Sequence, residues 1–145
     1  MDVPNSLLVR VGRRVDYESN GVTIDNGVAA FRLTPQEFAH WKTMQYSDKL
    51  AEWGLIADDP QALIPSRNGI LWDLDQYSKP QIHGIPTQGL PQDASQVVLS
   101  HEDLALWKQA NGLRLLTAMT DCSWPAVIRL VSQGVWTVHW SREVL

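Results

Sequence analysis

Apolar and polar positions along the first third of the chain alternate in short runs separated by turn residues. Apolar and β-branched residues dominate 7–18, and shorter runs of the same kind cover 22–25 and 28–32. Ser19-Asn20-Gly21 and Asn26-Gly27 separate the three runs. An Asn-Gly pair between apolar runs is a strong hairpin signal, because both residues accept a positive φ. The pattern predicts an N-terminal three-stranded antiparallel meander.

A ten-residue stretch then occurs twice, as Leu33–Lys42 and Leu99–Lys108, with Leu, Ala, Trp and Lys in the same places. Thr34 and Ser100 are suitable N-cap residues, and an acidic residue follows each of them three positions later. This combination is the capping box of a helix start. Each copy therefore predicts an amphipathic helix that presents a tryptophan to a core.

The segments that follow each copy predict the same succession of elements. Behind the first copy we expect short helices around Leu50 and over Pro60–Ser66, then a strand over 70–74. Behind the second we expect helices over 113–120 and 124–132, then a strand over 135–140. Asn68-Gly69-Ile70 and Gln133-Gly134-Val135, 65 positions apart, are expected to occupy equivalent places. Strand, three helices and a strand hairpin make up a winged-helix unit. The sequence therefore predicts an α+β fold of tandem winged helix-turn-helix units, the first with the meander.

Residues 75–95 differ in composition and hydrophobic pattern from the regions on either side. Three prolines alternate with glycines there and no hydrophobic period survives, which is typical of a semi-extended linker. We therefore expect a first unit over 1–74, a linker over 75–95 and a second unit over 96–145. The second unit shows no evident meander of its own.

The composition of the chain limits the classes of function that we expect of it. The 145 residues are 44% apolar with a net charge of −4, which gives no general attraction to nucleic acid. No apolar run approaches the roughly 20 residues of a membrane span, no signal peptide is recognisable, and a lone Cys122 suits a reducing compartment, so we expect a cytoplasmic protein. The four histidines are scattered without metal-ligand spacing, and Cys122 is expected to be a half-buried side chain. We therefore expect no enzyme, no metal and no cofactor.

Two kinds of binding remain. A winged helix could place its third helix in a DNA groove, but Pro60–Ser66 and Trp124–Ser132 are mostly apolar and poor at contacting phosphates. An open third strand could instead pair with an extended peptide. Peptide binding is the preferred hypothesis; a DNA-binding regulator or a structural subunit of an enzyme complex is the alternative.

Several segments resemble a known family. Val11-Gly-Arg-Arg-Val-Asp-Tyr17, Gly27-Val-Ala-Ala-Phe-Arg-Leu-Thr34 and the helix with Trp41 are similar to the small peptide chaperone of pyrroloquinoline-quinone biosynthesis. That domain recurs as the leader-peptide recognition element of enzymes that modify ribosomal peptides. Ala110-Asn-Gly-Leu-Arg-Leu-Leu-Thr117 resembles part of its helical region. The resemblance implies a non-enzymatic winged-helix protein that presents a leader or precursor peptide to a modifying enzyme.

The expected binding site follows from this hypothesis. The peptide would add as a further strand beside the third strand of the meander, with a wall from the third helix and a cationic contact for an acidic peptide residue. The strand residues are Val28, Ala29, Ala30, Phe31 and Arg32, the wall residues are Ala62 and Leu63, and the cation is Arg67.

Overall fold

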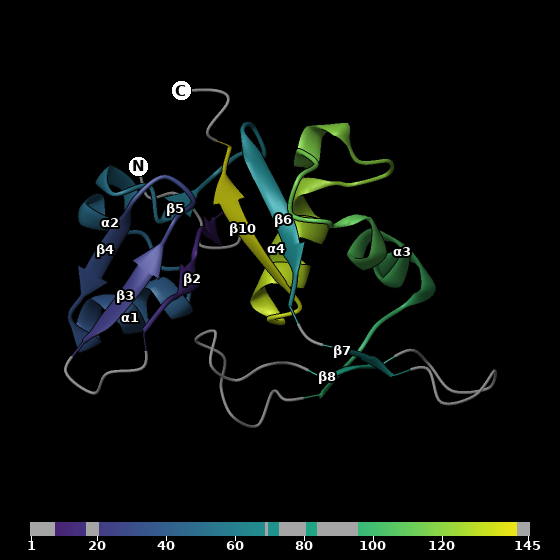
Figure 1. The fold of residues 1–145 in the computed structure, drawn as a ribbon, viewed down its shortest axis with the longest axis horizontal. Coiled ribbons are helices and arrows are strands. Elements are labelled where there is room, and N and C mark those ends of the chain that lie inside the picture. The colour runs from purple at the N-terminus through teal and green to yellow at the C-terminus, as the bar shows by residue number, and fades with distance from the viewer. Residues whose placement is uncertain (1–7, 17–20, 69, 73–80, 84–95, 142–145) are drawn as a thin grey trace.

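The computed structural model describes residues 8–16, 21–68, 70–72, 81–83 and 96–141. Within them the chain is an α+β protein of short antiparallel strands and four α-helices (Figure 1). The helices are α1 (Pro35–Lys42), α2 (Asp48–Glu52), α3 (His101–Gln109) and α4 (Trp124–Ser132), with a 3-10 helix, η4 (Leu116–Ala118).

The first half of the fold, residues 8–57, contains the expected meander. Strands β2, β3 and β4 form an antiparallel sheet in that order, and β3 pairs with β4 from Val22↔Leu33 to Asp25↔Ala30. A separate pair, β1 with β5, brings the two ends of this half together. The strands are β1 (Val9–Arg10), β2 (Arg13–Arg14), β3 (Val22–Asp25), β4 (Ala30–Leu33) and β5 (Ile56–Ala57).

The predicted helix starts are confirmed at both copies of the repeated stretch. Thr34 caps α1 in a full capping box: Glu37 N–H donates to Thr34 Oγ1 at 3.2 Å, and Thr34 N–H donates to Glu37 Oε1 at 2.8 Å. Ser100 caps α3 by accepting the Asp103 N–H at 3.1 Å. Caps are local interactions, which is why a short sequence window reveals them.

The helix expected over Pro60–Ser66 is wrong, because Leu63–Arg67 is strand β6. Gln61 N–H donates to Asp59 Oδ1 at 2.9 Å, and Ala62 takes a φ of 64°. The chain therefore turns instead of continuing a helix. Pro65 is compatible with β6 because this strand has one strand partner, β10 (Trp136–Trp140), and only an isolated bridge, Ser66 to Asn111, on its other side.

The second half also holds a three-stranded sheet, which the sequence pattern did not indicate. Strands β7 (Ile70–Trp72), β8 (Gln81–His83) and β9 (Gln96–Val98) pair antiparallel in that order. The expectation of an irregular 75–95 is thus wrong at Gln81–His83, while 75–80 and 84–95 lie outside the described residues. The strand expected over 70–74 is confirmed at β7, whereas the three residues of β8 leave too short an alternation to be detected from sequence.

The two halves repeat one arrangement of elements. In each, an antiparallel strand pair, β1·β5 or β6·β10, encloses a three-stranded sheet followed by two capped helices. The hydrogen bonds also correspond: Val11 N–H donates to Leu55 O at 2.8 Å, and Asn68 N–H donates to Val135 O at 2.9 Å. The repetition is thus present in the backbone register as well as in the order of elements.

Side-chain contacts also correspond between the two halves. They show that the segments after the helices were matched incorrectly in the predicted repeat. The Arg10 guanidinium lies 5.7 Å from the Trp41 ring centre, and the Arg67 guanidinium lies 5.6 Å from that of Trp107. The segments that begin at Asn68 and Gln133 were expected to be equivalent, but they are instead bonded to each other, with Asn68 Nδ2 donating to Gly134 O at 2.7 Å.

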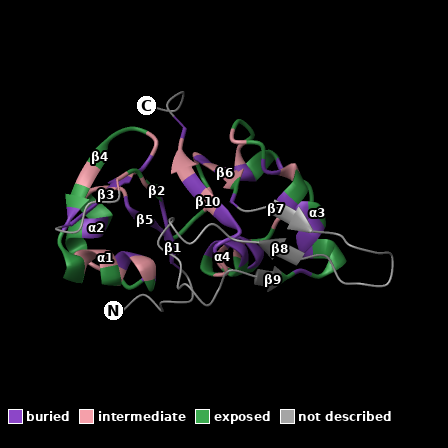
Figure 2. Ribbon diagram, turned by 60° about the horizontal axis from the view of Figure 1, so that its bottom comes forward, coloured by how far each residue is buried: buried purple, intermediate pink, exposed green. Residues whose placement is uncertain are grey.

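The halves share a hydrophobic core. The larger cluster combines Val9 and Val11 of the first half with residues of α3, α4 and β10, among them Leu130 and Trp136 (Figure 2). Fully buried aliphatic side chains each contribute about 1.5–3 kcal/mol to folding. Because β1 belongs to the first half but buries its side chains against the second, we expect the two halves to unfold together.

Arg10 joins the halves through polar contacts as well. Its side chain is buried, and its guanidinium donates to Lys42 O at 2.7 Å and to Val131 O. These carbonyls lie in the last turns of α1 and α4, where the helix macrodipole favours a cation. Burial lowers the pKa of Arg10 to about 10, so the side chain stays charged at neutral pH.

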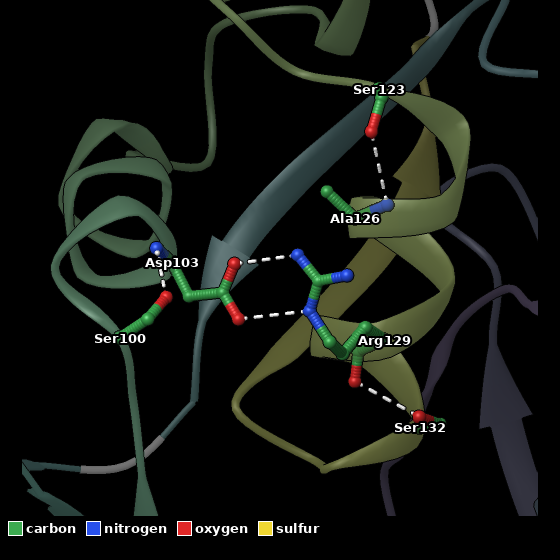
Figure 3. A network of polar contacts seen from close by, with 6 residues as sticks. All are labelled: Ser100, Asp103, Ser123, Ala126, Arg129 and Ser132. Atoms are coloured by element: carbon green, nitrogen blue, oxygen red, sulfur yellow. Dashed lines mark hydrogen bonds and ion pairs between the residues drawn. The ribbon is translucent and has the colours of Figure 1, made fainter.

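An ion pair links the two helices of each half at the same place. Asp103 Oδ1 accepts from Arg129 Nη2 at 2.7 Å and Asp103 Oδ2 from Arg129 Nε at 2.9 Å, so α3 and α4 are joined by a bidentate contact (Figure 3). In the first half, Lys49 Nζ of α2 lies 2.8 Å from Glu37 Oε2 of α1. The acid is the third helical residue in both cases, which explains its recurrence in the two copies of the repeated stretch.

These two ion pairs should differ in strength. The acids are 10% exposed at Asp103 and 19% at Glu37, and both cations are about half exposed, so the main difference is the bidentate geometry of the Asp103–Arg129 contact. In double-mutant cycles with alanine, we expect a coupling of about 1.5 kcal/mol for the Asp103–Arg129 pair. The Glu37–Lys49 pair should give about 0.5 kcal/mol and lose more of it in high salt. Urea unfolding followed by tryptophan fluorescence measures both; equal couplings would contradict the expectation.

Candidate functional site

Strand β4 lies at an edge of the sheet β2-β3-β4, as the peptide-binding hypothesis requires. Asn26 N–H donates to Ala29 O at 3.0 Å to close the β3–β4 hairpin. The alternation of an antiparallel ladder then directs the N–H and C=O of Ala30 away from β3, toward the outer edge. An additional strand could therefore pair with Ala30 without disturbing the existing sheet.

An apolar hollow adjoins the start of this strand. Its volume is about 290 Å³, and Val28, Trp53, Ala62 and Trp140 are among the side chains that line it. Val28 is 42% exposed, which is high for an aliphatic residue. The hollow is therefore open to a side chain of a bound partner.

The turn that holds Val28 is rigidly built. Asn26 is buried, its Oδ1 accepts the N–H groups of Val28 and Ala29 at 2.9 Å each, and its Nδ2 donates to Trp53 O at 2.9 Å. The sequence indicated a turn here from Asn26-Gly27. The structure adds that the Asn26 side chain connects this turn to the end of α2.

The structure brings some of the predicted site residues together and separates others. Val28 and Ala62 line the same hollow, and Ala30, Phe31 and Arg32 lie in β4. Ala29 is exposed in the turn just before that strand. The wall, however, is not a helix.

The remaining two predicted residues lie elsewhere. Leu63 is fully buried in β6, opposite Trp140, so it cannot contact a ligand. Arg67 lies at the far end of β6 from Ala62, over the Trp107 ring. Both were misplaced for the same reason, because β6 is extended where a helix was expected.

Aromatic residues that the sequence hypothesis omitted complete the site. The Trp53 ring stacks on Phe31 with centroids 5.1 Å apart, and the Lys49 ammonium lies 4.8 Å from the Trp53 ring centre. Trp140 Nε1 donates to Gly54 O at 2.7 Å, which holds β10 against the end of α2. Trp53 and Trp140 are far apart in sequence, so only the tertiary fold shows that they share a hollow.

The segments proposed for DNA contact are poorly suited to that role. Pro60–Ser66 forms no helix, and in α4 the side chains of Ala126, Val127, Leu130 and Val131 are buried. Arg129 of α4 is engaged by Asp103. These contacts leave few side chains of either segment for binding phosphates.

A metal site would need several His, Cys, Asp or Glu side chains close together. Over the described residues, no group of three or more His, Cys, Asp or Glu side chains could hold a metal ion. Cys122 is partly buried and burial raises the pKa of its thiol, which lowers its thiolate fraction at neutral pH. Over the same residues, no helix combines the length and apolarity needed to cross a membrane.

Comparison with known proteins adds no assignment: no protein-family model, no curated protein and no solved structure matches the chain.

Proposed function

We propose that the protein binds an extended peptide, which adds as a strand to β4 and places an apolar side chain in the hollow beside it. The observation that supports this proposal best is the edge position of β4 next to an open apolar hollow. Main-chain hydrogen bonds to the edge would give affinity, and the hollow would select the side chain.

The partly buried aromatic stack provides the second element of recognition. On the helix side of β4, the half-buried Phe31 and Trp53 rings stack into one apolar surface, and Trp53 also lines the hollow with Val28. Side chains of an added strand alternate between the two faces of the sheet, so every second one would meet this surface. The preferred peptide is therefore one with apolar residues at alternate positions.

The physiological occupant in this proposal is a leader or precursor peptide that the protein presents to a modifying enzyme. We further propose that each half is a reduced winged-helix unit, in which the three-stranded sheet supplies the wing. The repeated pairing of sheet and capped helices supports this view, and the resemblance of the first half to leader-recognition elements motivates it.

Replacing Ala30 with proline is the sharpest test. Proline removes the outward N–H of Ala30, which the ladder with β3 does not use, so the sheet should persist while the added strand loses a donor. Peptides selected from a displayed random library against the full chain should bind A30P about tenfold more weakly, because one hydrogen bond and its neighbouring pairing are lost. Fluorescence anisotropy measures the affinities.

The matched control is Ala30→Val, which keeps the N–H and favours a strand. It should bind selected peptides as the wild type does. Circular dichroism of A30P must match that of A30V for the comparison to report binding alone. If the library yields no binder, or if A30P binds with full affinity, the peptide does not pair with β4.

A further inference from the structure

A second hollow lies between the two halves and adjoins the apolar one, with which it shares Trp140. It has a volume of about 440 Å³, and its lining combines Gly12, Arg13 and Asp25 of the first half with residues of β6 and β10. Gly12 N–H donates to Val138 O at 2.7 Å, which fixes β2 beside β10 (Figure 1). Ligand sites are often found at such junctions between substructures.

The floor of this junction cleft is the outer face of the β6·β10 pair. Ser66 and Thr137 are directly opposed across the two strands, as are Ile64 and His139. These four side chains are half-buried, whereas Leu63, Pro65, Trp136 and Val138 at alternate positions are buried in the core. Two adjacent hydroxyl groups and an imidazole therefore line the base of the cleft.

The charges around the cleft favour an anion. Arg13 is exposed, and within the described part of the chain its guanidinium forms no hydrogen bond or ion pair. Asp25, opposite Arg13 in the β2–β3 ladder, is the acid that lines the cleft, and its Oδ1 accepts the Gly27 N–H at 2.7 Å. Arg67 of β6 borders the cleft, but its guanidinium lies over the Trp107 ring. Arg13 is therefore the cation that an anion in the cleft would meet.

The charged groups around the cleft shift the pKa of His139. Burial and the nearby Arg13 lower the pKa of His139, while Asp25 acts in the opposite direction. The imidazole is therefore mostly neutral at pH 7 and can donate a hydrogen bond from one ring nitrogen. An anion held between Arg13 and His139 would favour the protonated imidazole and raise its pKa.

We propose that the junction cleft binds the oxyanion of a small molecule, either a phosphate or a carboxylate group. Arg13 would supply the charge, and the hydroxyls of Ser66 and Thr137 together with His139 would supply further donors. Guanidinium and hydroxyl donors are the common ligands of both groups. This site is separate from β4, so it does not depend on the peptide proposal.

Titration with two anions of constant charge tests the proposal. Sulfate represents a phosphoryl group and acetate a carboxylate, with sodium chloride at matched ionic strength as the control. In amide and imidazole NMR spectra of the full chain, at least one oxyanion should give saturable shifts at Thr137 and His139. It should also raise the pKa of His139, so its affinity should increase as the pH falls through that pKa.

Two arginine variants separate a specific site from general charge effects. Arg13→Gln should weaken oxyanion binding about tenfold, because a charge-assisted contact is lost. It should also raise the pKa of His139 without any anion, since the neighbouring positive charge is gone. Arg114→Gln, at an exposed position that does not line the cleft, should change neither quantity. Shifts no larger than those in chloride, or equal binding by Arg13→Gln, would overturn the proposal.

Discussion

Replacing Arg10 with methionine should lower the free energy of unfolding by about 3 kcal/mol, the largest effect expected from any single charged side chain here. Arg10 donates to Lys42 O and Val131 O, in the last turns of α1 and α4. Methionine fills similar space but leaves both carbonyls without this donor. The two helix ends would also lose a cation that stabilises their dipoles. Because the two helices belong to different halves, the loss should appear as one cooperative transition.

Two comparisons isolate this effect. Arg10→Lys keeps the charge but presents a single ammonium in place of the planar fork, so it should recover only part of the stability. Arg114→Met removes an exposed arginine and should change the free energy of unfolding by less than about 0.5 kcal/mol. Urea denaturation monitored by tryptophan fluorescence gives all three values. A loss below about 1 kcal/mol for Arg10→Met would show that the contacts are not needed to hold the halves together.

The sequence predicted best those elements that depend on neighbouring residues. Thr34 with Glu37 and Ser100 with Asp103 define helix starts within four residues, and both starts are confirmed. The Asn26-Gly27 hairpin between β3 and β4 is also local, and it placed an edge strand correctly. Such signals need no information about the remainder of the fold.

The wrong predictions share a tertiary cause. The apolar residues at the start of Leu63–Arg67 are too few to distinguish a helix from a strand, and the pairing of this segment with β10 decides the outcome. The repeat was aligned in the wrong register because Asn68-Gly69 and Gln133-Gly134 look alike, although Asn68 and Gly134 in fact bind one another. Long-range pairing overrides local preference in both cases.

In the candidate sites, too, local sequence signals were predictable and long-range contacts were not. Ala30 could be predicted as an edge residue, because its strand follows from a local turn. The hollow could not be predicted, because Trp53 and Trp140 come together only when β10 packs against the end of α2. Likewise, Arg13 and His139 meet in the junction cleft only through the contact of β2 with β10.

Gly27 is the position where a single methyl group should have the second large effect on stability. Its φ is 98°, and a Cβ built there would lie 2.8 Å from Trp140 O and 2.9 Å from His139 Cβ. The sequence explains the glycine by the turn alone, whereas the structure adds the close approach of β10. Trp140 N–H donates to Asn26 O at 2.8 Å, so the strand cannot move away without breaking this bond.

Gly27→Ala should therefore lower the free energy of unfolding by about 3 kcal/mol, the sum of a strained φ and a backbone clash. Gly112→Ala is the matched control, because its φ of 78° is also positive but its Cβ would meet only Ser66 Oγ, at 3.2 Å. The control should lose about 1 kcal/mol from strain alone. Thermal and urea unfolding of both variants gives the difference, which measures the packing of β10 on the turn. Equal losses would mean that the turn needs glycine for its conformation only, and that β10 tolerates a side chain there.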